Sequence, residues 1–174
     1  MEADYGEEQD RAVGEHMESD NYIQIMMDSL VQKIAILEKI SVLNIEQKGI
    51  AEMAEFDEQL FHDNADKKEA LIEAILKLDD GFDSLFARVS ECLEGNRDKY
   101  REQIGKMQGY IKQITDLSVQ VQAQEMRNKK LLEQKFSSMR KDLHNAKRST
   151  KMANTYYKNM NKLSNDSYFL DQKN

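Results

Sequence analysis

Residues 71 to 92 read LIEAILKLDDGFDSLFARVSEC, and they decide the fold because apolar residues return in them at alternating steps of three and four. A second stretch of this kind follows at residues 100 to 121, YREQIGKMQGYIKQITDLSVQV. The apolar positions are Leu71, Ile75, Leu78, Phe82, Leu85, Val89 and Cys92, then Tyr100, Ile104, Met107, Ile111, Ile114 and Val121. A spacing of about 3.5 residues places each series along one stripe of a helix that needs a partner helix to cover it. The chain has no proline, and we predict an all-α fold.

The first helix is expected over residues 21–62. Its apolar series runs from Ile23 to Ile40. Beyond this series the pattern loosens and then resumes out of phase, and Gly49 in the same region weakens a helix by about 1 kcal/mol relative to alanine. We therefore expect a kink near residues 44–50.

The second and third helices are expected over residues 65–94 and 98–151. Asn64 can cap the second helix, and Gly81 should be tolerated inside it because the apolar series keeps its phase there. Gly95 can adopt the left-handed conformation that ends a helix. The connection at Gly95 therefore separates two long helices that can pack side by side.

The third helix is expected to be longer than its partners. Unbroken, it would extend about 80 Å, against about 45 Å for the second helix. Its apolar series also has a gap between Val121 and Leu132. We expect an elongated antiparallel hairpin or bundle of three long helices with coiled-coil character over residues 21–151, with the distal part of the third helix projecting or packing on something else.

Both ends of the chain are expected to lie outside these helices. Residues 1–20 hold eight acidic residues, one basic residue and no helical stripe, which is typical of an acidic disordered tail. Residues 152–174 are rich in Asn and Ser, yet they contain aromatic clusters at Tyr156 and Tyr168. We expect the aromatic side chains of this C-terminal tail to dock, either on the bundle or on a partner.

Charge is distributed unevenly along the chain, whose net charge is -7. Residues 1–20 sum to -7, whereas residues 127–151 hold nine basic residues against Glu133 and Asp142 and sum to +7. The two segments either attract each other or keep their own surroundings solvated. Nucleic acid is not expected as a partner, because the basic segment lacks the interleaved aromatic platforms that stack on bases.

Composition also bears on the compartment. The single cysteine excludes an intramolecular disulfide, and Cys92 is expected in the core because it lies on the apolar stripe. No stretch approaches the about 20 apolar residues of a membrane span. The start, MEADYGEEQD, is acidic where a secretory signal would be basic and then apolar. We expect a cytoplasmic protein that does not insert into a membrane.

No motif of catalysis or cofactor binding stands out. There is no Gly-rich phosphate loop and no cysteine pair. His62 beside Asp63 is better explained as a turn at a helix boundary than as a metal site. Residues 144–149, HNAKRS, are similar to the helix of a histidine phosphotransfer domain that accepts a phosphoryl group, but Arg148 stands where such domains commonly have Gly. We predict an ordinary surface histidine at 144, no enzyme activity, no metal and no cofactor.

Several stretches resemble the FlgN-like flagellar export chaperones. They are the Met- and Ile-rich first helix, the second helix with FDEQLFHDNADKKEALIEAILKLDDGF at residues 56–82, the long third helix, and a final YYKNM followed by YFLDQKN. The resemblance covers about residues 21–174. It implies a protein that binds hook-associated proteins before type III secretion, covers their terminal helices and hands them to the export gate.

A partner-binding surface is expected on the distal third helix and the tail, because the apolar residues there have no evident intramolecular cover. Its residues are Leu132, Phe136, Met139, Leu143, Tyr156, Tyr157, Tyr168 and Phe169. One alternative is a coiled-coil scaffold that associates with itself, and a less favoured one is a phosphotransfer domain with His144 as the acceptor. Whether the protein is a monomer or a homodimer stays open.

Overall fold

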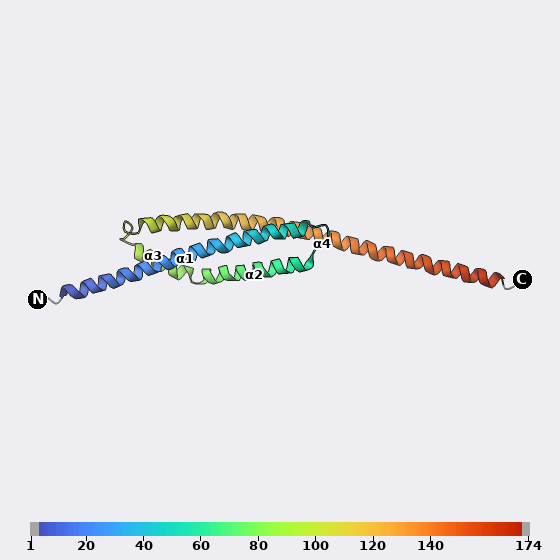
Figure 1. Cartoon of the computed structure of the whole chain (residues 1–174), viewed down its shortest axis with the longest axis horizontal. Coiled ribbons are helices and arrows are strands. Elements are labelled where there is room, and N and C mark those ends of the chain that lie inside the picture. The colour runs from blue at the N-terminus through green and yellow to red at the C-terminus, as the bar shows by residue number, and fades with distance from the viewer. Residues whose placement is uncertain (1–3, 172–174) are drawn as a thin grey trace. The chain divides into compact units, whose positions relative to one another are not determined.

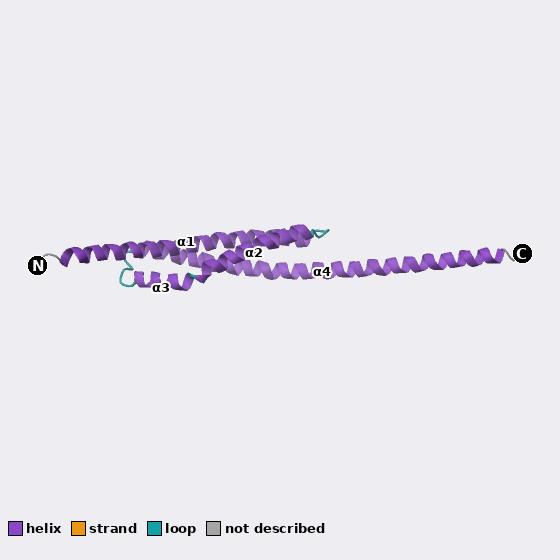
Figure 2. Ribbon diagram, turned by 90° about the horizontal axis from the view of Figure 1, so that it is seen from below, coloured by secondary structure: helices purple, strands orange, loops and turns teal. Residues whose placement is uncertain are grey.

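The computed structural model describes residues 4–171, and the side chains from residue 17 to residue 155. Four helices follow one another: α1 (Asp4–Glu52), α2 (Glu58–Asp80), α3 (Phe82–Leu93) and α4 (Arg101–Asp171). No strand occurs among the described residues (Figure 2). The predicted all-α fold is confirmed, with four helices in place of three.

The chain divides into two units, Met1–Lys129 and Lys130–Asn174. In the first unit, α2 and α3 run back alongside α1, and residues 101–129 of α4 then follow the direction of α1 (Figure 1). In its described part, the second unit is the remainder of α4. The first unit is thus a bundle whose two ends carry the connections at residues 53–57 and 94–100.

The expected disordered tail over residues 1–20 is wrong for its described part, because α1 already begins at Asp4. The prediction rested only on the absence of an apolar stripe in these residues. Extending a helix that already exists avoids the unfavourable nucleation step. The segment also holds five Glu and two Ala, which are good helix formers.

The expected kink at residues 44–50 is also absent, since α1 continues as one helix to Glu52. The apolar series loosens there because polar residues take over its face. Ser41, Asn44 and Gln47 are all buried, and their spacing of three keeps them on the side that the apolar residues occupy earlier in the helix. The sequence pattern therefore records a change of chemistry along one continuous helix.

The boundary between the first two predicted helices lies earlier than expected. Instead of reaching residue 62, α1 ends at Glu52, and α2 begins at Glu58. Asp57 is the N-cap, and its side chain accepts a hydrogen bond from the N–H of Leu60 at 3.0 Å. Asn64, which we expected as the cap, lies inside α2 and is buried. Aspartate and asparagine cap helices about equally well. The sequence alone therefore could not decide between Asp57 and Asn64 as the N-cap, because it does not show that Asn64 is buried.

Gly81 separates α2 from α3, which corrects the prediction of one helix over residues 65–94. Its φ and ψ are -98° and -1°, and its C=O accepts the first hydrogen bond of α3, from the N–H of Leu85 at 3.1 Å. Glycine has the weakest helix propensity after proline, so the helix ends here although its apolar stripe continues. The partly buried Phe82 and Leu85 still pack on the core.

Gly95 ends the α3 segment as predicted, with a φ of +74° in the left-handed region that glycine adopts without strain. The N–H of Asn96 then donates to the C=O of Leu93 at 3.1 Å. These contacts turn the chain at residues 94–100. Residues 101–129 can therefore pack beside α3.

The predicted end of the third helix at residue 151 is wrong, because α4 continues to Asp171. The expected tail at residues 152–174 is thus helical in its described backbone. The last glycine of the chain is Gly109, and no proline is present. The sequence beyond it therefore contains neither of the two residues that most strongly interrupt a helix.

An apolar core lies at the end of the first unit that carries residues 94–100. Its buried members come from α1, α3, the following connection and α4: Ile23, Met26, Leu30, Val89, Tyr100 and Met107. Ile104 and Ile114 pack against this cluster. Ile111, which we placed on the same stripe, is 43% exposed.

Candidate interaction surfaces

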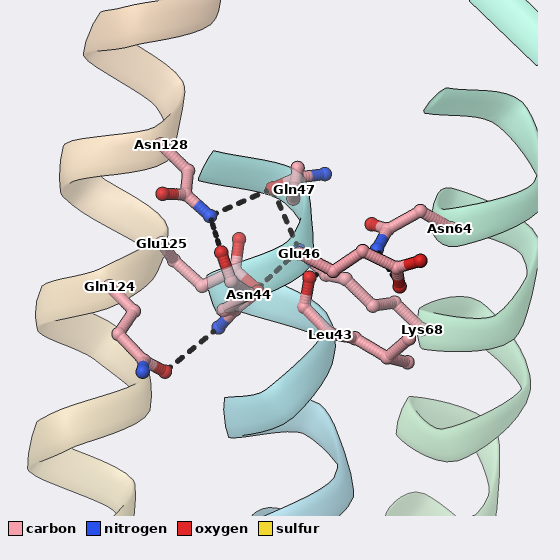
Figure 3. A network of polar contacts seen from close by, with 9 residues as sticks. All are labelled: Leu43, Asn44, Glu46, Gln47, Asn64, Lys68, Gln124, Glu125 and Asn128. Atoms are coloured by element: carbon pink, nitrogen blue, oxygen red, sulfur yellow. Dashed lines mark hydrogen bonds and ion pairs between the residues drawn. The ribbon is translucent and has the colours of Figure 1, made fainter. Parts of the chain in front are cut away.

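Towards the other end of the first unit, polar side chains are buried next to apolar ones such as Ile50 and Ala51, and we call these polar side chains the polar layer. Its seven buried members are Ser41, Asn44, Gln47, Asn64, Lys68, Gln124 and Asn128. They come from α1, α2 and α4, so the layer joins three helices (Figure 3). Buried polar groups are costly unless they are hydrogen-bonded, and the contacts between these helices follow from that requirement.

Amide side chains join α1 to α4. Asn128 donates through Nδ2 to the C=O of Asn44 at 2.7 Å and to Oε1 of Gln47 at 3.2 Å (Figure 3). Gln124 donates through Nε2 to Oγ of Ser41 at 3.0 Å, and its Oε1 accepts from Nδ2 of Asn44 at 3.4 Å. These bonds connect residues one turn apart on both helices, so a shift of one helix along the other would break several of them together.

A lysine and an asparagine join α2 to the same layer. Lys68 Nζ lies 2.6 Å from Oε1 of Glu125 and 3.2 Å from Oε1 of Gln47. Asn64 donates through Nδ2 to the C=O of Leu43 at 2.9 Å. Lys68 is buried, whereas the Glu125 side chain is 42% exposed, so this ion pair spans the boundary between the interior and water. Such geometry fixes register more than it adds stability.

A polar tie lies at the apolar end. Tyr100 donates through its hydroxyl to Oδ1 of Asp20 at 2.6 Å, and Lys99 Nζ donates to the same hydroxyl at 2.9 Å. Burial raises the pKa of Tyr100, and its bond to Asp20 raises it further. The pKa of Lys99 is raised chiefly by its hydrogen bond to Tyr100. This tie holds α1 against the connection that precedes α4.

An apolar groove lies between α3 and the start of α4. Its volume is ≈ 530 Å³, and its walls include Phe86, Leu93, Ile104 and Ile111, with Met26 also in its lining. Phe86 is 53% exposed. The groove therefore presents apolar side chains to solvent on the first unit, at a place that the sequence analysis did not identify.

The predicted partner-binding residues with described side chains all lie on the part of α4 in the second unit, and we call them the client surface: Leu132, Phe136, Met139 and Leu143. Leu132 is half-buried, Phe136 and Met139 are each 36% exposed, and Leu143 is 57% exposed. Steps of three and four place the four on one face of the helix. A shallow polar groove that includes Gln134, Ser138 and Lys141 lies on a different face of the same segment, so this part of α4 is amphipathic.

The remaining predicted partner residues, Tyr156, Tyr157, Tyr168 and Phe169, belong to α4 by their backbone. Their side chains lie outside the described residues, and the prediction for them stays a prediction.

The residues weighed for chemistry are dispersed. His62 and His144 are exposed, and they lie on α2 and α4. Cys92, which we expected in the core, is only half-buried. Among the described residues, no group of three or more His, Cys, Asp or Glu side chains is placed to hold a metal ion. No helix in the described part of the chain is long and apolar enough to cross a membrane.

Comparison of the chain with models of protein families, with curated proteins and with solved structures gives no match. The function must therefore be argued from the surfaces described above.

Sequence analysis missed the polar layer, although two signals pointed to it. The apolar series of α1 stops at Ile40, and that of α4 stops at Val121. In each gap the next positions of the stripe are Asn or Gln, which we interpreted as a kink or a shift of phase. Uncharged amides that continue an apolar stripe at its own spacing are the signal for a buried polar layer.

Proposed function

We propose that the protein is a helix-binding chaperone of the flagellar export type, which holds the terminal helix of a secreted hook-associated protein along the client surface. The observation that carries this proposal is the amphipathic segment of α4 in the second unit. Phe136, Met139 and Leu143 expose between a third and two thirds of their surface along one helical face. A helix binds a second amphipathic helix through apolar residues at this spacing.

Charge supports a particular kind of client. The segment 127–151 carries a sum of +7, and by their spacing Lys135 and Arg140 lie on either side of the client surface. A client helix with acidic residues beside its apolar ones would gain from this field, chiefly in its rate of association. The resemblance of the sequence to FlgN-like chaperones names hook-associated proteins as the first clients to test, and the export gate as the site of delivery.

The test is titration calorimetry of the full chain with C-terminal fragments of hook-associated proteins. We expect Phe136→Ala and Leu143→Ala each to weaken binding by about tenfold or more, as truncation of an apolar anchor at an interface does. Gln134→Ala is the matched control, because Gln134 lies on the polar face of the same segment. A defined complex whose affinity is unchanged in both apolar variants would move the site away from the client surface.

Truncation after residue 151 tests the aromatic residues of the chain end. Affinity should fall if Tyr156, Tyr157, Tyr168 and Phe169 contact the client, and it should rise if they cover the client surface in its absence. The absence of any complex with hook-associated fragments would favour the coiled-coil scaffold instead.

A further inference from the structure

Within the first unit, α4 carries a second stripe beside the one that packs on the apolar core. We call it the exposed stripe, and its residues are Ile104, Gln108, Ile111, Thr115, Val119, Gln122 and Met126. With 3.6 residues in each turn, these seven positions fall within an arc of about 80° on a straight helix. Ile104 is half-buried, but Ile111, Val119 and Met126 are 43%, 63% and 75% exposed. Aligned apolar residues with this exposure mark an interaction surface.

The order of residues along the exposed stripe is symmetric about Thr115. Four residues to either side stand Ile111 and Val119, seven residues to either side stand Gln108 and Gln122, and eleven residues to either side stand Ile104 and Met126. The stripe therefore shows the same chemistry in both directions. In an association with two-fold symmetry, residue i of one copy meets residue j of the other and j meets i. A stripe that is symmetric in sequence meets this condition when two copies of one helix lie antiparallel.

We propose that two copies of this chain associate through the exposed stripe, with their α4 helices antiparallel and Thr115 on the two-fold axis. Ile111 then faces Val119 of the second copy, and Ile104 faces Met126 of the second copy. Gln108 faces Gln122 of the second copy, and two amides can bond to each other. Apolar residues thus meet apolar residues, and amides meet amides, along the whole contact.

The groove between α3 and α4 fits this arrangement. Ile104 and Ile111 are shared by the exposed stripe and the groove wall, and Phe86 is exposed on the opposite wall. Val119 and Met126 of the second copy, which face these two isoleucines, therefore enter the groove. Each copy offers the groove and the side chains that fill it, so the surface is self-complementary.

Polar groups beside the stripe do not oppose the association. Thr115 donates its hydroxyl proton to the C=O of Ile111 at 2.9 Å, so this hydroxyl needs no partner in the contact. Lys112 and Asp116 lie one turn apart and form an ion pair of 2.9 Å. The two signs beside the symmetry axis avoid the repulsion that like charges would cause.

Charge at the two ends of the pairing favours a second copy as the occupant. The α4 helix of one copy leaves the pairing at Lys129, where it faces the connection 94–100 of the other copy and the bond between Tyr100 and Asp20. The residues that come next in its sequence, 130–151, contain seven basic residues against two acidic ones. The residues that precede Asp20 are predominantly acidic. The two segments carry net charges of opposite sign, so two copies of the chain are complementary in charge as well as in the exposed stripe.

Sedimentation equilibrium of the full chain tests the association. We expect a dimer with a Kd of about 1 to 100 µM, and a Kd raised on the order of 100-fold in the double variant Ile111→Glu with Val119→Glu. The matched control is Val42→Glu with Ile45→Glu, which adds the same charge at two apolar side chains of α1 that are 64% and 63% exposed. A protein that stays monomeric at about 1 mM, or a dimer weakened equally by both double variants, would overturn the proposal.

A crosslinking experiment tests the antiparallel arrangement separately, in a Cys92→Ser background and with a short thiol-specific reagent. Thr115→Cys should crosslink to itself, because this residue lies on the two-fold axis. Gln108→Cys alone should not crosslink, whereas a mixture of Gln108→Cys and Gln122→Cys chains should. Self-crosslinking of Gln108→Cys would show a parallel pairing and contradict the proposal. None of these results depends on a client, so they leave the proposed chaperone function to its own test.

Discussion

The two ends of the first unit hold the same helices together with different chemistry. Near residues 94–100, Met26 and its neighbours remove apolar surface from water, which stabilises by about 25 cal/mol for each Å². In the polar layer, amides and Lys68 exchange hydrogen bonds to water for hydrogen bonds to protein, and each exchange contributes only about 1 kcal/mol. Apolar burial, to which Ile50 and Ala51 also contribute beside the polar layer, therefore supplies most of the stability.

The polar end supplies specificity instead. Apolar stripes tolerate a shift of one helix along another, since one apolar side chain replaces the next. Asn44, Gln124 and Asn128 do not allow such a shift, because each donor then loses its acceptor. The polar layer therefore sets the register of α4 against α1 within the first unit.

The largest effect is expected at the apolar end. Met26→Asp places a carboxylate where the side chain is 2% exposed, and it should lower the free energy of unfolding by at least about 3 kcal/mol. Ile25→Asp is the control, because Ile25 is the next residue along the helix and is 51% exposed. This variant should change the free energy of unfolding little. Urea unfolding followed by circular dichroism measures both. Equal losses in the two variants would show that the apolar end is not the anchor of the first unit.

A smaller loss is expected in the polar layer. Asn128→Ala removes the side-chain donor at 2.7 Å from the C=O of Asn44, which stays in the hydrogen-bond ladder of α1, and Oε1 of Gln47 keeps its bond to Lys68. Loss of the two hydrogen bonds that Asn128 donates should lower the free energy of unfolding by about 2 kcal/mol. Lys129→Ala, at an exposed neighbour, is the control for the change in helix propensity. A loss as large as that of Met26→Asp would make the polar layer equal in stability to the apolar core.

Helix content and the turn at Gly95 could be predicted from the sequence, because periodicity and glycine chemistry are local. The continuity of α1 through residues 44–50 could not, because a stripe scored only for apolar residues ends where Asn44 and Gln47 begin. Their partners Gln124 and Asn128 lie about 80 residues further along the chain, so the reason for their burial is visible only when α1 and α4 pack together.

The surfaces were predictable in part for a similar reason. Leu132, Phe136, Met139 and Leu143 share one helical face, as their spacing indicated. Ile111 was assigned to the core because a helix of 3.5 residues per turn brings it onto the stripe of Met107. In the structure Ile111 lies on the groove wall. The core stripe and the exposed stripe are only a fraction of a turn apart on α4, so the sequence alone could not assign Ile111 to one of them without the position of α3.

The polar tie at the apolar end gives a pH-dependent prediction. Tyr100 has a raised pKa, because burial and the bond to Asp20 favour its neutral form. The stability it contributes is therefore fully present below the ordinary tyrosine pKa of about 10 and is lost as pH rises through the raised value. Tyr100→Phe should lower the free energy of unfolding by about 1 kcal/mol at neutral pH and should remove this pH dependence.

Two measurements check the tyrosine prediction. The difference between the ultraviolet titration curves of the parent and of Tyr100→Phe isolates the ionisation of this one side chain. Unfolding experiments at neutral and alkaline pH then give the stability of both chains. If the gap in stability between the two chains stayed constant across the ionisation of Tyr100, the tie to Asp20 would not be linked to folding.

The smallest effect is expected for Lys68→Met, although Lys68 is the most buried charge described in this chain. Methionine keeps most of the volume of the lysine stem. Glu125, which loses its partner at 2.6 Å, is 42% exposed and can be solvated by water, and Gln47 still accepts from Asn128. No buried group is orphaned, so the free energy of unfolding should change by less than about 1 kcal/mol, whereas breaking a fully buried ion pair costs about 3 to 5 kcal/mol.

Urea unfolding measures the difference, and double replacement of Lys68 and Glu125 by Met and Gln gives the coupling between them. A loss of about 3 to 5 kcal/mol for Lys68→Met alone would mean that Glu125 is desolvated in solution. The polar end would then depend on a buried charge pair instead of on its amides.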